Sequence, residues 1–154
     1  MKQESGRSMI EMLGVLAIMG IITVGAIGLI STAMRTQKRS TVNDEVLQIV
    51  TGVRQLLGEY DDFSSIDNST IFGAIGVKNK NPYGGAYTLG VNPANSRQFI
   101  VGITGLGKSD CEYLKTKAWS DSVGFQMSDG KQSGATGECG KDNGNNSVQI
   151  IYGD

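Results

Sequence analysis

A single carboxylate stands at the edge of a long uncharged stretch near the start of the chain. Glu11 directly precedes 23 residues without a charge, Met12 to Met34, and follows a short polar segment that contains Lys2 and Arg7. Placing a carboxylate in hydrocarbon costs about 2.5–3.5 kcal/mol at a helix centre, and somewhat less near the interface. We expect a residue with that cost to have a cationic partner. Glu11 is therefore the first candidate functional residue.

Other side chains that commonly do chemistry are scarce. Histidine is absent and the net charge is −1, which disfavours histidine-based catalysis and gives no support for nucleic-acid binding. No Gly-x-Ser-x-Gly nucleophile elbow and no metal-ligand spacing is present. Acidic residues near Asp61 and Asp67 lack the alternating spacing, the glycine and the final Glu of an EF-hand loop. We expect no enzyme, no catalytic residue, no cofactor and no bound metal.

Two cysteines, Cys111 and Cys139, lie far beyond the uncharged stretch. In an exported domain such a pair is expected to form a disulfide. Closing the loop between them would contribute on the order of 3 kcal/mol or somewhat more in the chain-entropy model. Two unrelated buried thiols are the alternative. The absence of a Cys-x-x-Cys spacing gives no support for zinc or thioredoxin-like chemistry.

The uncharged stretch is long enough to cross a membrane as a helix, roughly 34 Å against a hydrocarbon core of about 30 Å. It could be a plain signal anchor, a secretory signal cleaved after Ser31-Thr32-Ala33, or a helix that leaves the membrane to pack against copies of itself. Its length and Glu11 disfavour the cleaved signal, and the basic residues that follow Met34 conflict with a simple anchor. Small residues that allow close helix packing favour the third interpretation: Gly14, Ala17, Gly20, Gly25, Ala26 and Gly28.

The N-terminal region resembles that of type IV pilins. The similarity is carried by Gly6-Arg7-Ser8-Met9-Ile10-Glu11-Met12-Leu13 and by Val15-Leu16-Ala17-Ile18-Met19-Gly20-Ile21-Ile22. It implies that a prepilin peptidase cuts after Gly6, that Arg7 becomes the N-methylated first residue, and that Glu11 pairs with the amine of a neighbouring subunit. Such a pair at about 4 Å gains about 4 kcal/mol at an effective dielectric near 20, comparable with the burial cost. Arg7 departs from the family, which usually has an apolar residue there.

Apolar residues continue at spacings of three and four beyond the uncharged stretch, which predicts an amphipathic helix. Because no proline lies between Ile10 and Gly58, we expect one helix of about 50 residues that ends at Gly58. The segment Thr41-Val42-Asn43-Asp44 could instead begin a second helix, with the two meeting near Ser40. The predicted apolar stripe comprises Val42, Val46, Leu47, Ile49, Val50, Val53, Leu56, Leu57 and Tyr60.

Short strands separated by turns are expected in the rest of the chain. Residues 61–70 read as a polar loop, and residues 110–118 as a short helix with Tyr113, Leu114 and Trp119 on its apolar side. The segments expected to be strands are 86–91, 99–103, 123–127 and 148–152, the first two as an antiparallel hairpin.

The predicted fold is therefore α+β, a long N-terminal helix packed on a small antiparallel sheet. We expect three regions. Residues 1–6 are the leader, residues 7–35 are the transmembrane and filament-core half of the helix, and residues 36–154 are a globular domain with the amphipathic half of the helix and the sheet.

The second half of the chain is similar to type IVb pilins of the toxin-coregulated and conjugative thin-pilus type. The similarity lies in Asn81-Pro82-Tyr83-Gly84-Gly85 and in Phe99 to Leu106 running into Cys111-Glu112-Tyr113-Leu114. It implies a structural pilus subunit that an assembly platform moves from the bacterial inner membrane into a homo-oligomeric helical filament on the cell surface. The alternatives are a pseudopilin of a type II secretion system and a membrane-anchored exported binding domain. The cysteine pair favours the pilus, since major pseudopilins typically use a calcium site instead.

Overall fold

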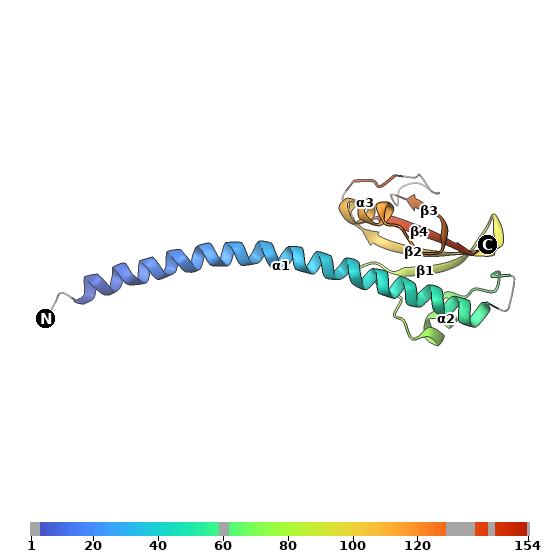
Figure 1. Cartoon of the computed structure of the whole chain (residues 1–154), viewed down its shortest axis with the longest axis horizontal. Coiled ribbons are helices and arrows are strands. Elements are labelled where there is room, and N and C mark those ends of the chain that lie inside the picture. The colour runs from blue at the N-terminus through green and yellow to red at the C-terminus, as the bar shows by residue number, and fades with distance from the viewer. Residues whose placement is uncertain (1–3, 59–61, 129–137, 142–143, 154) are drawn as a thin grey trace. The chain divides into compact units, whose positions relative to one another are not determined.

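The computed structural model of the chain describes residues 4–58, 62–128, 138–141 and 144–153 (Figure 1). Its elements follow one another in the order α1, α2, β1, β2, α3, β3, β4. The fold is α+β, with a long N-terminal helix and a four-stranded antiparallel sheet, as predicted. The chain divides into two units, Met1–Ser40 and Thr41–Asp154.

Helix α1 runs without a break from Glu4 to Leu57. The expectation of one helix is confirmed, and the alternative of two helices meeting near Ser40 is wrong. The helix begins earlier than the predicted Ile10, at Glu4, in a segment without proline. At its other end the Gly58 amide donates to the Arg54 carbonyl at 2.8 Å, and a Cβ at Gly58 would lie 2.1 Å from that oxygen. Glycine is therefore required at this position, directly after the last residue of the helix.

One side of α1 is buried within Thr41–Asp154. Its buried residues recur at spacings of three and four: Val42, Val46, Ile49, Val50 and Val53. The predicted stripe is confirmed for these five residues and wrong for Leu47 and Leu56, which are exposed. Leu47 lies about 100° around the helix from Val46, and Leu56 is in the last turn. Tyr60 lies outside the described residues.

Four antiparallel strands form the sheet: β1 (Tyr87–Asn92), β2 (Asn95–Leu106), β3 (Ser122–Ser128) and β4 (Asn146–Gly153). Each matches a predicted segment, and β1 and β2 form the expected hairpin. Their order in the sheet is β1-β2-β4-β3. Strand β4, the last in sequence, therefore lies between β2 and β3 and pairs with both.

Alternate residues of the strands supply the other side of the core. In β4, Val148, Ile150 and Tyr152 are buried, while the residues between them are only partly so. The Phe99 ring lies 5.0 Å from the Phe63 ring and 5.6 Å from the Tyr152 ring, measured between centroids. These side chains and the buried stripe of α1 belong to one hydrophobic core.

Polar contacts also join the second half of α1 to the rest of its unit. The Tyr87 hydroxyl donates to Glu45 Oε2 at 2.5 Å, and burial together with Glu45 raises the pKa of Tyr87 above its ordinary value. The Lys117 ammonium donates to Asn43 Oδ1 and lies 4.6 Å from the centre of the Trp119 ring. These contacts add directional constraints to the apolar packing of α1.

Helix α2 (Asn68–Ile75) overlaps the segment predicted to be a loop, so that prediction is wrong from Asn68 onward. The Asp67 carboxylate caps the helix by accepting from the Ser69 hydroxyl at 2.6 Å and from the Thr70 amide at 3.0 Å. These bonds lower the pKa of Asp67 to about 2. Ile71 and Phe72 are buried, which anchors this short helix to the core.

The turn before β1 is built around the buried side chain of Asn81. Its Nδ2 donates to the Thr104 and Ala86 carbonyls at 2.8 and 3.2 Å, and its Oδ1 accepts from the Tyr83 and Gly85 amides at 3.0 and 3.1 Å. A Cβ at Gly85 would lie 2.0 Å from the Thr104 carbonyl oxygen. The sequence predicted this turn, and the structure shows that the Asn81 side chain hydrogen-bonds it to the end of β2.

We predict that Asn81→Ala lowers the free energy of unfolding by roughly 2–4 kcal/mol, because it leaves several buried backbone groups without partners. Denaturant unfolding of the full chain in detergent measures this change. Asn79→Ala is the matched control, since the Asn79 side chain is exposed, and it should change stability by less than about 0.5 kcal/mol. Equal effects of the two variants would contradict the role given to Asn81.

Candidate assembly surface

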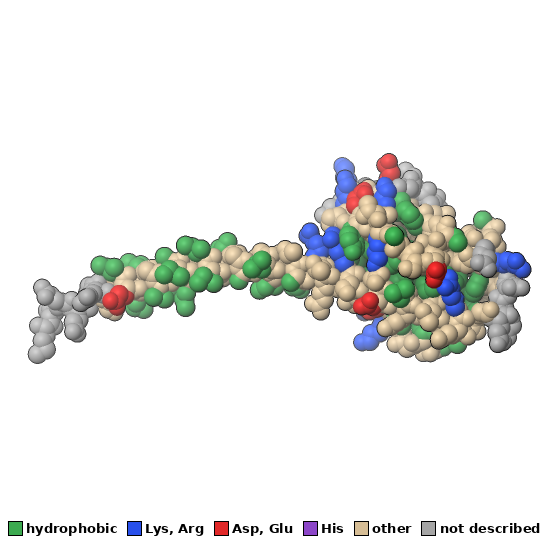
Figure 2. Space-filling model, viewed as in Figure 1, with side chains coloured by type: hydrophobic (Ala, Val, Ile, Leu, Met, Phe, Trp, Pro, Cys, Tyr) green, Lys and Arg blue, Asp and Glu red, His purple; other side chains and the backbone are tan. Residues whose placement is uncertain are grey.

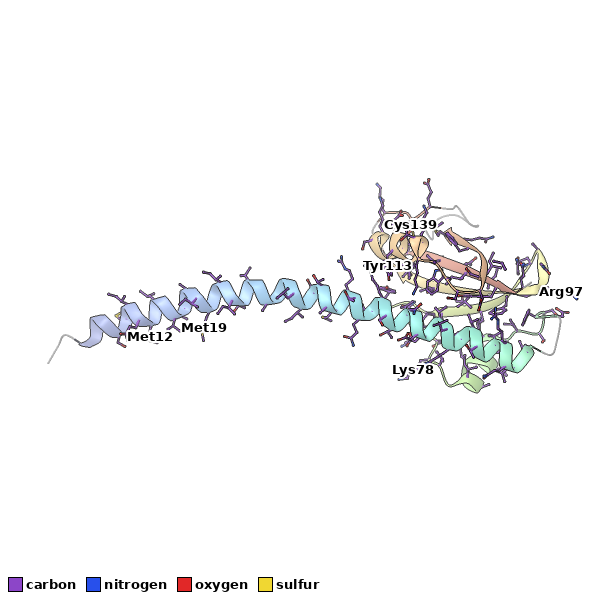
Figure 3. The ribbon with its side chains drawn as sticks, in the orientation of Figure 1. Met12, Met19, Lys78, Arg97, Tyr113 and Cys139 are labelled. Carbon is purple, nitrogen blue, oxygen red and sulfur yellow. A yellow bond between two sulfur atoms is a disulfide. The ribbon has the colours of Figure 1, made fainter. Side chains whose placement is uncertain are left out.

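The first half of α1 carries large apolar side chains that the chain itself leaves exposed. Fifteen of them, from Met9 to Met34, have exposed fractions between 53% and 76%, and Figure 2 shows hydrophobic side chains along this part of the helix. In Figure 3 two of them, Met12 and Met19, point away from the helix. By length and composition the helix could cross a membrane, a property that anchors and signal sequences share. This surface is compatible with membrane anchoring.

The few polar side chains in this segment satisfy their hydroxyl groups within the helix. Thr23 donates to the Met19 carbonyl at 2.7 Å, and Ser31 and Thr32 both donate to the Gly28 carbonyl, at 2.9 and 3.1 Å. A hydroxyl bonded to its own helix backbone can enter an apolar environment without losing a hydrogen bond. The segment is therefore suited to an environment without water around its full circumference.

Four glycines in this segment pack against nothing in the part of the chain that the structure describes. An added Cβ at Gly14, Gly20, Gly25 or Gly28 would meet nothing within 4 Å. Each glycine costs the helix about 1 kcal/mol relative to alanine. Gly52 differs, because a Cβ there would lie 2.3 Å from a methyl carbon of Ile75. Gly52 has a reason inside the fold, and the other four have none until another molecule approaches the helix.

Glu11 lies in the first half of α1 beside Met12 and Val15, two exposed apolar residues. Among the side chains that the structure describes, none donates a hydrogen bond or forms an ion pair with Glu11. Ser8 lies one helical turn before it and lines the same shallow hollow. A cationic partner for Glu11, as the sequence predicts, would come from outside the described side chains.

Gly6 and Arg7, the predicted cleavage and methylation positions, belong to α1 in their backbone. The side chain of Arg7 lies outside the described residues.

Cys111 and Cys139 form a disulfide, which confirms the predicted pair. Cys111 is buried in α3 (Lys108–Thr116), and its Cα lies 6.0 Å from that of Cys139 (Figure 3). The bond joins α3 to the segment that leads into β4. Nearby, the Trp119 indole donates to the Leu114 carbonyl at 3.1 Å, although Trp119 lies beyond α3 and not on it as predicted.

One surface feature of Thr41–Asp154 was not predicted from the sequence. A groove lies between α1 and α2, lined in part by Leu47, Leu56 and Ile75. The signal that could have shown it is Asp67, a helix N-cap followed by apolar residues at 71, 72 and 75. Within the described parts of the chain, no group of three His, Cys, Asp or Glu side chains is placed to hold a metal ion.

We predict that reduction of the Cys111–Cys139 bond lowers the free energy of unfolding by about 3–4 kcal/mol. The bond closes a loop between residues 28 positions apart, and its loss raises the conformational entropy of the unfolded chain. Thermal unfolding of the full chain in detergent, with and without reductant, measures the loss. A chain carrying Cys111→Ala and Cys139→Ala is the control and should not respond to reductant. Two free thiols, detected by alkylation and mass spectrometry without reductant, would contradict the bond.

The sequence comparisons identified no relative of this chain. The chain matches no protein-family model and no curated protein sequence. Its function is therefore inferred from its own residues, and above all from the exposed apolar half of α1 with Glu11 at its edge.

Proposed function

We propose that this protein is a structural subunit of a type IV pilus of the type IVb kind. The observation that carries the proposal is the row of fifteen exposed large apolar side chains on α1, with Glu11 as the single charge from Ser8 to Met34. Such a surface needs an apolar environment, and a membrane and a bundle of identical helices both supply one. A pilus subunit lies first in the membrane and then in the helix bundle.

Glu11 supplies the preference for the bundle over the membrane. Apolar side chains gain little by moving from lipid to a helix bundle, because lipid tails are as apolar as leucine. A carboxylate in lipid has no partner, whereas in the bundle it can meet the N-terminal amine of the next subunit. At about 4 Å this pair is worth about 4 kcal/mol at an effective dielectric near 20, which offsets a burial cost of about 2.5–3.5 kcal/mol or less.

The four glycines support the same proposal. Gly14, Gly20, Gly25 and Gly28 leave open space beside the helix backbone, and small residues allow helix backbones to approach closely. The stability that they cost α1 can be recovered through close contact with another helix. The sheet domain, stabilised by its disulfide, would lie outside such a helix core.

Processing follows from the position of the polar leader. In this proposal a prepilin peptidase in the inner membrane removes residues 1–6, Arg7 becomes the N-methylated first residue, and an assembly platform adds subunits to a surface filament. Cleavage after Gly6 places Glu11 five residues into the mature chain, where the amine of a neighbouring subunit can reach it.

We predict that the protein from sheared surface filaments begins at Arg7 and carries a methyl group on its N-terminal nitrogen. Intact mass and N-terminal sequencing measure both. A chain that begins at Met34 would show cleavage by signal peptidase and would overturn the proposal. A chain that begins at Met1 would indicate an unprocessed membrane anchor.

We predict that Glu11→Ala reduces filament number by roughly tenfold or more, because it removes an attraction of about 4 kcal/mol, while the amount of protein in the membrane stays unchanged. Electron microscopy of filaments and immunoblots of membranes measure the two quantities. Glu11→Gln should behave like Glu11→Ala, since it also lacks the charge. Asp44→Ala, an exposed acid further along α1, is the control. Wild-type filament numbers in Glu11→Ala cells would show that the charge is not needed.

A further inference from the structure

Three basic residues follow the apolar half of α1 within little more than one helical turn. They are Arg35, Lys38 and Arg39, and they are the first charged residues after Glu11. Arg35 and Lys38 are exposed, and Arg39 is half-buried. Their spacings of three and four place them on one side of the helix, so their charges add at a single surface. We call these three residues the basic turn.

The acidic residues of α1 are not placed to neutralise the basic turn. The next acid along the helix is Asp44, and no acid lies three or four residues from any member of the turn, where a helical ion pair could form. Within the part of the chain that the structure describes, no side chain forms an ion pair or a hydrogen bond with Arg35 or Lys38. These two cationic side chains are therefore available to an anionic partner from outside.

The position of the basic turn along α1 matches the headgroup layer of a bilayer. Helix α1 is continuous through this region, and its uncharged residues Met12–Met34 reach roughly 34 Å, enough to cross a hydrocarbon core of about 30 Å. The headgroup region adds about 5–7 Å on each side, and the distance along the helix from Arg35 to Arg39 is about 6 Å. Asp44 lies roughly 13 Å beyond Arg35. The cations thus coincide with the headgroup layer, and the next acid lies outside it.

We infer that the basic turn binds the phosphate groups of anionic phospholipids when α1 spans the membrane, an inference that rests on the membrane-bound state of the proposed function. The lipids are those of the leaflet at the Met34 end of the span. Arginine and lysine side chains extend far enough to reach phosphates beside the helix, and a guanidinium group binds phosphate through paired hydrogen bonds. Anionic headgroups are favoured over zwitterionic ones, because they carry a net negative charge. The contact holds the subunit at a fixed depth before assembly.

The location of the basic turn favours a lipid over a soluble anion. Headgroups surround a membrane-spanning helix at high local concentration, so a contact made by few charges suffices. A free phosphate would have to be captured from solution by the same few charges. The net charge of the chain is −1, which gives no general attraction for a polyanion such as nucleic acid.

Fluorescence quenching in vesicles tests this contact. The two cysteines of the chain are bonded to each other, so Gln37→Cys, at an exposed position within the basic turn, supplies the reactive thiol. The full chain is labelled there with bimane and reconstituted in phosphatidylcholine vesicles that contain a minority of phosphatidylglycerol. A nitroxide quencher near the headgroup is carried by phosphatidylglycerol in one sample and by the same amount of phosphatidylcholine in the other. The ratio of the two quenching constants measures the local enrichment of the anionic lipid.

We expect the anionic lipid to be enriched roughly threefold or more, and high salt to reduce the enrichment. Arg35→Gln with Lys38→Gln should remove most of it, whereas Arg35→Lys with Lys38→Arg should retain it, because the charges remain. Lys78→Gln with Lys80→Gln is the matched control, since it removes the same charge from two exposed positions outside α1 and should leave the enrichment unchanged. Formation of the Cys111–Cys139 bond in every variant checks that the domain still folds.

Three results would overturn the lipid contact. Equal quenching by the two lipids, or equal losses in the basic-turn pair and the control pair, overturns it and leaves the proposed function standing. Loss of the enrichment when glycerol phosphate is added at constant ionic strength overturns it too, because the turn would then bind a free phosphate. A labelled chain that alkaline carbonate removes from the vesicles has no membrane-spanning helix, which overturns the proposed function and the contact with it.

Discussion

Between Met9 and Met34, α1 exposes fifteen large apolar side chains, each of which gains about 1.5–3 kcal/mol when it leaves water. That gain is too large for the segment to remain in water, so every state of the protein must cover it with lipid or with other protein. The absence of proline, the internally bonded hydroxyls and the single acid at one end are all compatible with this requirement. The disulfide-bonded sheet unit needs no such cover, because its own core is buried.

The two halves of α1 meet the same physical requirement in different ways. In the second half, valines and an isoleucine at spacings of three and four pack into the core, and Gly52 allows α2 to approach closely. In the first half, the apolar residues surround the helix and the glycines touch nothing. In one helix, the second half is thus buried by the chain's own core, whereas the first half can be buried only by lipid or by other protein. This division supports the proposed role as a structural subunit.

Local patterns predicted much of the fold. The 3.6-residue period and the lack of proline indicate α1, and β-branched segments between turn residues indicate all four strands. Features that depend on packing between distant segments were not predictable in the same way. Helix α2 was missed because its polar start resembles a loop, although Asp67 is a good N-cap. Leu47 and Leu56 fit a helical stripe by spacing alone, and only the position of the sheet shows that they are exposed. Cys111 and Cys139 could be paired from sequence because a disulfide depends on only two residues. The role of Glu11 stays a prediction.

The central place of β4 in the sheet has a consequence for the order in which the sheet can form. Strand β3 pairs only with β4 among the described strands, and β2 gains its second neighbour from β4 as well. Until β4 joins the sheet, β2 lacks one neighbour and β3 has no partner among the described strands. The β1–β2 hairpin can form by itself, whereas β3 can enter the sheet only together with β4. Because β4 follows β3 in sequence, the described sheet is completed last at its middle.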